Sequence, residues 1–397
     1  MVAISNIPGS LPTKSSGMHV LTVTPFYPVE EDNAAGCFVS EPLLWLQKEE
    51  IRSTVLAVRP RYRSRAHVSP KASPAIWIYY WSVPGGIGLP LAGAFLFARI
   101  VSHVRRLHQT DPVDLIHAHA ALPCGHAAML LSRELGIPYV VSVHGLDVYS
   151  DVQVTGRAGQ WCRRISRRVY ESSRRVICIS ERVREQVLEG TGKCRTSVAY
   201  NGADPELFFS SASESSPAPI ILSVGNLIPV KGHDLLLRAA ACLAVEFPAL
   251  AWEIIGDGPE RARLQGLARE LRIAGCVRFL GRQSRQQVAE AMRRCTLFAL
   301  PSRYEGLGCV YLEAMSTGRA VIGCRGQGIA EVIRHGTNGF LIGPDNQKEL
   351  TLAIAMLLRD PALRRDIGIA ARETILEKFT LAHQAENLAR IYRESTA

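Results

Sequence analysis

Two acidic residues and two glycines lie close together in one stretch of the chain, LPSRYEGLGCVYLEAMSTGRAVIGC, which runs from Leu300 to Cys324. Glu305 and Glu313 are eight positions apart, and Gly306 and Gly308 lie between them. The apolar pattern on either side predicts a strand, a loop, a helix and a second strand. We therefore expect one carboxylate in the loop and the other about one turn inside the helix, beside backbone N–H groups that bind anions well.

This combination of carboxylates and a helix start indicates one kind of ligand. A carboxylate can accept hydrogen bonds from two neighbouring sugar hydroxyls, and a helix start can bind phosphate. A nucleotide sugar, with phosphates between two hydroxylated rings, would satisfy both groups. The alternative interpretation is a pair of ordinary solvated glutamates. It is disfavoured by the glycines that follow Glu305 and by the apolar residues around Glu313.

Three other positions suit the same ligand. His144 follows an apolar, strand-like run, at the end where open parallel sheets bind ligands, although a histidine that only caps a strand is the alternative. Lys231 and Gly232 precede an amphipathic helix, which fits a phosphate contact. Gly36 lies near the first predicted strand-to-helix turn, where a glycine lets the backbone approach a ligand. The turn itself is an equally good reason for that glycine.

Metal and hydride chemistry are poorly supported by the remaining motifs. His117, His119 and His126 are close in sequence, but no carboxylate or cysteine joins them at a known zinc spacing. The G-D-G at 256–258 lacks the third glycine of a dinucleotide fingerprint, because Arg261 stands there. We expect no bound metal and no cofactor.

The length and composition predict two domains. A chain of 397 residues, 47% apolar and 21% charged, suits two α/β domains of roughly 180 residues each. The stretch SSASESSPAP is the natural linker. We predict a disordered tail at 1–17, an N-terminal domain at 18–209, a linker at 210–219, a C-terminal domain at 220–378 and a last helical segment at 379–397.

The compartment is predicted from cysteines and apolar runs. The ten cysteines include no C-x-x-C pair, which is typical of a reducing compartment. The longest apolar stretch, Val83 to Val104, is interrupted by Pro84, Pro90 and Arg99, and so falls short of the ~20 clean residues of a spanning helix. We expect a cytoplasmic protein that is not integral to a membrane.

With these residues in view, EGLGCVYLE resembles the E-x7-E signature of the family 4 retaining glycosyltransferases. The similarity extends from about His19 to the C-terminus. It implies the GT-B fold, an α/β architecture of two Rossmann-like domains facing each other across a cleft, with the last helix packed back on the N-terminal domain. GNLIPVKGHDLL and CRGQGIAEVI are similar to the branch that includes the teichuronic acid biosynthesis glycosyltransferase, which implies work on bacterial surface polysaccharide.

The resemblance also assigns roles to single residues. In the family, the first glutamate of the signature contacts the donor sugar and the second contacts the ribose, which points to Glu305 and Glu313. The lysine of a K-G pair holds the diphosphate, and Lys231 matches it. The histidine of an H-G pair faces the transferred sugar, which points to His144, and Gly36 corresponds to the glycine of the first loop. His144, Lys231 and Glu305 are the predicted catalytic residues.

One position departs from the family pattern. Many members carry an arginine where this chain has Asn226, and an amide cannot replace its charge, so Lys231 would bear more of the diphosphate. Arg282 or Arg303 are the candidates to compensate. The remaining predicted donor-binding positions are the backbones of Gly306, Leu307 and Gly308.

The predicted function is retaining transfer of a sugar from a UDP- or GDP-sugar to an acceptor in exopolysaccharide, teichuronic acid-like or O-antigen biosynthesis. A nucleotide-sugar epimerase of the same fold and a non-catalytic nucleotide-sugar-binding protein are the alternatives. The net charge of +10 raises the possibility of nucleic-acid binding, but no basic motif with interleaved aromatic residues accompanies it. We expect no nucleic-acid partner.

The positive charge is concentrated in the first half of the chain. Residues 1–205 contain 23 Lys and Arg against 16 Asp and Glu, whereas the rest contains 23 against 20. The excess lies in RPRYRSR (Arg59 to Arg65) and in the segment from Arg157 to Arg175. Such clusters attract anionic lipid, so we expect a peripheral protein at the inner face of the cell membrane, acting on a lipid-linked saccharide. Solvated helix faces are the alternative interpretation.

Overall fold

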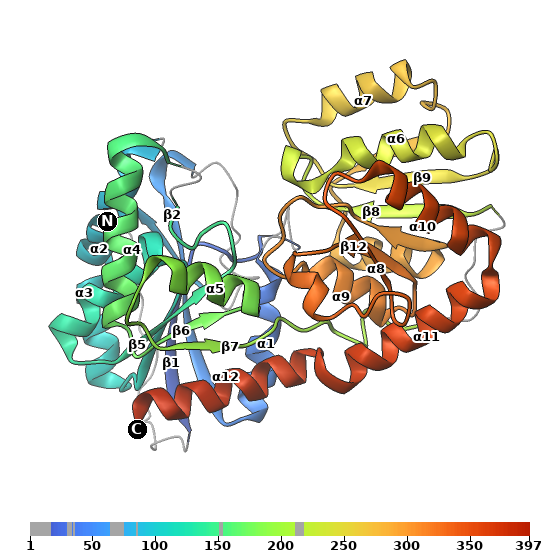
Figure 1. Cartoon of the computed structure of the whole chain (residues 1–397). Helices are drawn as coiled ribbons and strands as arrows, with labels where there is room; N and C mark the ends of the chain where they lie inside the picture. The colour runs from blue at the N-terminus through green and yellow to red at the C-terminus, as the bar shows by residue number, and fades with distance from the viewer. Residues whose placement is uncertain are drawn as a thin grey trace, which may run out of the picture.

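The computed structural model describes residues 17–29, 34, 36–63, 75–84, 86–150, 154–210 and 218–397, and it contains two lobes, each built on one sheet (Figure 1). The predicted tail at 1–17 lies outside these residues except for Gly17, and so does most of the predicted linker at 210–219. The basic loop predicted from Arg59 is described only as far as Arg63.

The first lobe contains a seven-stranded sheet in which all neighbouring strands are parallel. Its strand order is β3-β2-β1-β4-β5-β6-β7, and Val20 lies opposite Ser53 on one side and Leu115 on the other. The strands are β1 (Met18–Thr24), β2 (Ile51–Pro60), β3 (Ile76–Tyr80), β4 (Leu115–His119), β5 (Tyr139–Val143), β6 (Arg175–Cys178) and β7 (Thr196–Val198). The helices are α1 (Cys37–Lys48), α2 (Leu89–Thr110), α3 (His126–Leu135), α4 (Gly156–Ser172) and α5 (Glu181–Gly190).

The second lobe contains a six-stranded parallel sheet with the order β10-β9-β8-β11-β12-β13. Its strands are β8 (Ile220–Val224), β9 (Ala251–Ile255), β10 (Val277–Gly281), β11 (Leu297–Ala299), β12 (Val321–Cys324) and β13 (Phe340–Ile342). The helices that follow β8 are α6 (His233–Leu243), α7 (Arg261–Glu270), α8 (Arg285–Arg294), α9 (Cys309–Ser316), α10 (Gln347–Arg359), α11 (Pro361–Lys378) and α12 (Leu381–Thr396). Two parallel, doubly covered sheets are the predicted α/β architecture.

Both sheets reverse their direction of growth at one point. In the first, the chain builds β1, β2 and β3 outward and then returns to place β4 on the other side of β1. In the second, it builds β8, β9 and β10 and then places β11 on the other side of β8. Parallel sheets open a crevice at the carboxyl ends of the strands where such a reversal occurs. The loops after β1, β8 and β11 are therefore the ones placed to bind a ligand.

Helix α2 forms a wall of the first lobe. Residues Gly86–Thr110 are long and apolar enough to cross a membrane by length and composition, with a mean hydropathy of 1.6. However, one face of this helix, with Leu96, Ile100 and Val104, is fully buried in the core of this lobe, while Leu91 and Phe95 on the helix are exposed. Pro90 lies in the first turn, where proline is tolerated, so the predicted interruption of the apolar stretch there is wrong.

The last helix, α12, leaves the second lobe and packs on the first, where it contacts α1, β4 and β5 (Figure 1). Leu388 and Tyr392 lie in one apolar cluster with Val20 and Leu115. The Tyr392 hydroxyl is hydrogen-bonded to His117 Nδ1 at 2.7 Å. This helix therefore ties the second lobe to the back of the first sheet through both apolar packing and a buried hydrogen bond.

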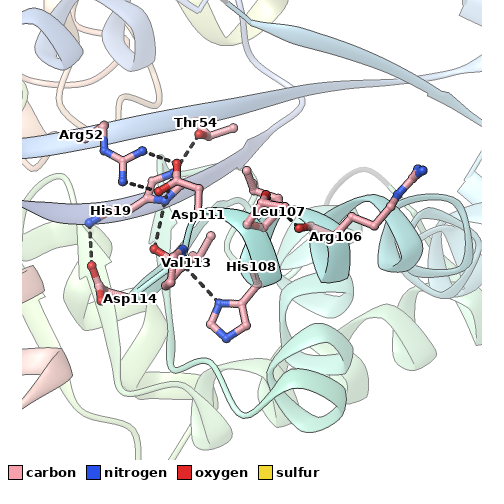
Figure 2. Close-up of polar contacts among 11 residues, drawn as sticks. His19, Arg52, Thr54, Arg106, Leu107, His108, Asp111, Val113 and Asp114 are labelled. Carbon is pink, nitrogen blue, oxygen red and sulfur yellow. Dashed lines mark hydrogen bonds and ion pairs between the residues drawn. The ribbon is translucent and has the colours of Figure 1, made fainter. Parts of the chain in front are cut away.

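A polar network holds the amino ends of the central strands, at the edge of the first sheet opposite the carboxyl ends (Figure 2). The backbone N–H of His19 donates to Asp114 at 2.7 Å, and the His19 ring is bonded to Thr54 at 2.8 Å. Arg52 donates to Asp111 at 2.6 Å. Burial lowers the pKa of His19, so its ring is neutral at pH 7. The network fixes the register of β1, β2 and the loop before β4.

The buried imidazole of His117 predicts acid sensitivity. Burial, with a smaller effect from His144, lowers the pKa of His117 to about 3. The folded state therefore holds it neutral, and the unfolded chain takes up a proton below pH 6.5, so stability is complete above that pH and is lost as the pH falls. When the pH is lowered from 7.5 to 5.5, His117 alone should decrease the free energy of unfolding by about 1.4 kcal/mol.

Urea unfolding of wild type and His117→Gln at both pH values measures this contribution. The decrease on acidification should be smaller in the variant by about the stated amount. Equal decreases in the two proteins would contradict the assignment of a neutral, buried His117.

Candidate functional site

A cavity of about 530 Å³ lies between the lobes, at the carboxyl ends of both sheets. Its volume is within the usual range for small-molecule sites. Apart from Glu313 and the candidate Arg303, every predicted site residue lines this cavity. These residues are Gly36 and His144 from the first lobe, and Asn226, Lys231, Arg282, Glu305, Gly306, Leu307 and Gly308 from the second.

An ion pair joins two loops in the wall of the cavity. Lys231 lies in the turn after β8, and its Nζ donates a hydrogen bond to Glu305 Oε1, in the loop after β11, at 2.7 Å. Ser302 Oγ donates to the same oxygen at 2.9 Å. The Glu305 side chain is only 8% exposed, so its charge needs these partners. The pair places an ammonium and a carboxylate side by side where the two loops meet.

The loop after Glu305 leads directly into the start of α9. The Glu305 N–H donates to the side chain of Gln327 at 3.0 Å, which fixes the loop. Gly308 is the N-cap of α9, with a left-handed φ of 87° and no side-chain cap. Cys309 and Val310, in the first turn, line the cavity. Because no side chain caps this turn, its N–H groups suit an anionic ligand.

His144 follows β5 and closes the cavity from the first lobe. Its Nε2 lies 3.1 Å from His119 Nδ1, and the rings of Phe26 and Phe38 flank it at centroid distances of 5.6 and 4.7 Å. Burial lowers the pKa of His144, against the opposing charge of Asp147. The imidazole is therefore neutral at pH 7, with one donor and one acceptor nitrogen, and can hydrogen-bond a sugar hydroxyl.

Gly36 is the N-cap of α1 and has a φ of 81°. A Cβ at this position would lie 2.6 Å from the backbone of Phe26 and Tyr27, in the same loop. The chain's own turn therefore requires a glycine here, whatever the ligand. Gly36 lines the cavity all the same.

Glu313 does not line the cavity. It lies in the second turn of α9 and is 3% exposed. Its Oε1 accepts a hydrogen bond from Arg285, the first residue of α8. The structure therefore places the second predicted carboxylate behind the helix start and pairs it with Arg285, which was not among the predicted site residues.

Comparison with known families identifies this arrangement. Residues 205–374 match the family described as glycosyl transferases group 1, and residues 38–207 match glycosyltransferase family 4. The N-acetyl-alpha-D-glucosaminyl L-malate synthase of Bacillus anthracis is 30% identical over 293 residues, which cover 70% of this chain and 74% of that protein. The chain is a group 1 glycosyltransferase. The alpha-D-kanosaminyltransferase of Streptomyces kanamyceticus is likewise 30% identical, over 70% of this chain and 77% of that protein.

Solved structures confirm the predicted GT-B fold for this glycosyltransferase. The sucrose-phosphate synthase of Thermosynechococcus elongatus superimposes with a TM-score of 0.77 at 21% identity, covering 95% of this chain and 98% of that one. The Anabaena protein HepE, in complex with UDP and glucose, superimposes with a TM-score of 0.75 at 21% identity over 95% and 99% of the two chains.

Asn226 of the glycosyltransferase lines the cavity, together with the cations Lys231 and Arg282. Of the two arginines considered as replacements for the usual arginine, Arg282 lines the cavity. Arg303 does not, because it is paired with Asp234 at 2.9 Å and Asp345 at 2.7 Å. Arg303 holds loops of the second domain together and is not placed to bind the ligand.

Three partners of the predicted residues in this glycosyltransferase were not predicted from the sequence. Ser302 could have been found, because it lies three positions before Glu305 in the same loop. Gln327 and Arg285 had no local signal, since each reaches its glutamate from a distant segment. Of the three clustered histidines, His117 serves the fold and is bonded to Ser142 and Tyr392, whereas His119 contacts His144. Within the described ranges, no group of three His, Cys, Asp or Glu could hold a metal ion.

The Lys231–Glu305 pair predicts a repairable loss of stability. Lys231→Met should lower the free energy of unfolding by roughly 1–3 kcal/mol, because Glu305 stays buried without its cation. Adding Glu305→Gln should recover at least half of that loss, since a neutral amide needs no cation. Urea unfolding of the two variants at pH 7.5 measures both values. Equal losses in the single and double variants would contradict a buried, charge-paired Glu305.

Proposed function

We propose that this glycosyltransferase moves a sugar from a UDP- or GDP-linked donor to its acceptor with retention of anomeric configuration. The observation that carries the proposal is the meeting of Lys231, Glu305 and the uncapped start of α9 in one cavity. The ammonium and the helix N–H groups suit a diphosphate, and the carboxylate suits the hydroxyls of the sugar. The HepE structures, which contain UDP, UDP with glucose, or UDP-glucose, support a donor of this class.

The proposed mechanism follows from where charge develops. The bond between the anomeric carbon and the diphosphate oxygen breaks, which leaves positive charge on the sugar and negative charge on the diphosphate. Lys231 and the N–H groups of α9 stabilise the departing diphosphate, so that no metal ion is needed. The acceptor oxygen bonds to the same face of the sugar, and its proton passes to a phosphate oxygen. Neutral His144 and the carboxylate of Glu305 hold the sugar hydroxyls during transfer.

A panel of nucleotide sugars tests the donor. UDP-glucose, UDP-galactose, UDP-N-acetylglucosamine and GDP-mannose are compared by thermal shift, and at least one should raise the melting temperature. Lys231→Ala should lose roughly 2–4 kcal/mol of donor or transition-state binding, as should Glu305→Gln. Protein that binds none of the four, or variants with unchanged affinity, would count against the proposal. Acceptor-free conversion of the donor sugar to its epimer would identify an epimerase instead.

We further propose that the acceptor is a lipid-linked saccharide of bacterial surface polysaccharide, reached at the inner face of the cell membrane. The names of the relatives do not select an acceptor, because they range from an L-malate synthase to a glycogen synthase. The support comes from the first domain, whose surface carries several exposed apolar side chains. They are Trp81 (71% exposed), Val83, Ile87 (79%), Leu91, Phe95 and Trp161.

These side chains gather at one edge of the domain. Trp81 follows the carboxyl end of β3, and the turn containing Ile87 contacts α4. Leu91 and Phe95 lie near the start of α2, which also contacts α4. Carboxyl strand ends and the starts of the following helices lie at the same edge of a parallel sheet, so this surface lies at the edge of the first sheet that also bears the cavity. An acceptor anchored in a bilayer would enter from this side.

The adjacent helix α4 adds positive charge. Arg157, Trp161, Arg164 and Arg168 are exposed and recur at intervals of three and four, so they form one stripe of the helix. Basic residues at an anionic leaflet contribute about 1 kcal/mol each, and the aromatic residues add apolar contact. Arg167 of the same helix is outside this stripe, and its Nε donates a hydrogen bond to the Gly190 carbonyl of the same domain.

Liposome flotation tests the proposed membrane surface. Wild type should float with vesicles containing phosphatidylglycerol at low salt, and less at high salt. Ile87→Ser with Trp161→Ser should reduce flotation at least about fivefold, because apolar contact with the bilayer is lost. The matched control is Val245→Ser with Leu352→Ser, which changes exposed apolar residues of the second domain. Equal flotation of the two double variants would refute this surface.

A further inference from the structure

Three aromatic rings form one surface of the cavity on the side of the first domain. Phe26 lies in the loop after β1, Phe38 is the second residue of α1, and His144 follows β5. The ring centroids of Phe26 and Phe38 are 5.6 Å apart, and those of Phe38 and His144 are 4.7 Å apart. All three residues line the cavity, and both phenylalanines are half-buried. These three residues are called the aromatic wall below.

The backbone holds the aromatic wall in place. Thr24, at the carboxyl end of β1, is fully buried. Its hydroxyl donates to the Phe26 carbonyl at 2.9 Å and accepts from the Phe26 N–H at 3.0 Å. Gly36, which begins α1, passes so close to this turn that a Cβ would lie 2.6 Å from the Phe26 carbonyl carbon. The turn therefore fixes Phe26 beside Phe38, and a preorganised surface of this kind loses little entropy when a ligand binds.

The charges of the cavity come from the other domain. Lys231, Arg282 and Glu305 line the cavity from the second domain. Among the described residues that line it from the first domain, no side chain is ionised at pH 7, since burial lowers the pKa of His144 and keeps it neutral. Ile179 extends the apolar surface on this side. A ligand that lies against the described part of this wall therefore meets aromatic and aliphatic groups.

Such a surface suits the face of a sugar ring. A pyranose presents C–H groups on its faces and hydroxyls around its edge. The face of an aromatic ring carries partial negative charge, so it attracts C–H groups in addition to the gain from apolar contact. The hydroxyls at the edge of the sugar stay free for polar groups. A carboxylate or phosphate at the same place would lose its water without gaining a cation, which is costly.

We propose that Phe26 and Phe38 select the acceptor by stacking on a neutral sugar ring, and that they disfavour an acceptor ring that carries a carboxylate or a phosphate. The inference rests on the proposed transfer from a nucleotide sugar, and it adds the chemical class of the ring that receives the sugar. The aromatic wall comes from the first domain, whereas Lys231 and Glu305 come from the second. A ring stacked on the wall would thus lie between the aromatic faces and the donor.

Saturation-transfer NMR tests this selection, in the presence of UDP or GDP, whichever the protein binds. The probes are the neutral methyl glycosides of glucose, galactose, mannose and N-acetylglucosamine, together with methyl glucuronide, which carries a carboxylate. At least one neutral glycoside should bind, with most saturation on the C–H protons of one ring face. Methyl glucuronide should bind at least about tenfold more weakly than the best neutral glycoside.

Variants of Phe38 separate aromatic stacking from general apolar contact. Phe38→Leu should weaken binding of the neutral glycoside roughly three- to tenfold, because the aromatic face is lost, whereas Phe38→Trp should retain the binding. Both variants should keep the wild-type affinity for the nucleotide sugar. The matched control is Phe209→Leu, which changes a 43% exposed phenylalanine that packs on Arg293 and does not line the cavity. It should leave both affinities unchanged.

The outcomes distinguish this inference from the proposed function. Wild type that binds no nucleotide sugar overturns both. Wild type that binds a nucleotide sugar but no neutral glycoside, or that binds methyl glucuronide equally well, overturns only the selection by the aromatic wall. The same conclusion follows if Phe38→Leu matches Phe209→Leu, or if it weakens the nucleotide sugar as much as the glycoside.

Discussion

Burial of the Glu305 carboxylate is the constraint on which the site depends. A carboxylate held at 8% exposure is costly unless cations and hydrogen-bond donors surround it. Two donors bind the carboxylate, Lys231 from the loop after β8 and Ser302 from the same loop as Glu305. The side chain of Gln327, which follows β12, accepts from the Glu305 N–H and so fixes the backbone of the loop. The loops of the cavity are therefore held together by the same charges that would bind a donor.

The topology explains why this cluster lies in a cleft. Each sheet reverses direction once, beside β1 in the first domain and beside β8 in the second, and the carboxyl ends at both reversals face the same cavity. The α12 helix closes the connection by packing against the back of the first sheet, where Tyr392 reaches His117. Of the predicted catalytic side chains, Lys231 and Glu305 follow β8 and β11, the two strands at the reversal of the second sheet, and His144 follows β5 at the carboxyl edge of the first sheet.

Charge pairing also joins the two domains. Arg285 on α8 of the second domain binds Glu41 on α1 of the first domain and Glu313 on α9 of its own domain. Removing one partner of a buried ion pair leaves an uncompensated charge, so these contacts stabilise the observed arrangement of the domains.

The sequence by itself determined the two α/β domains and the residues of the cavity wall, because apolar periodicity and glycine-rich turns are local signals. The E-x7-E stretch, Lys231 and His144 could be predicted from the sequence for that reason. Only the tertiary structure decided which partners they have. Arg285 reaches Glu41 from 244 positions away, and Glu313 turns away from the cavity wall toward that arginine. Hydrogen bonds between distant segments leave no periodic trace in a sequence, since they depend on how the domains close.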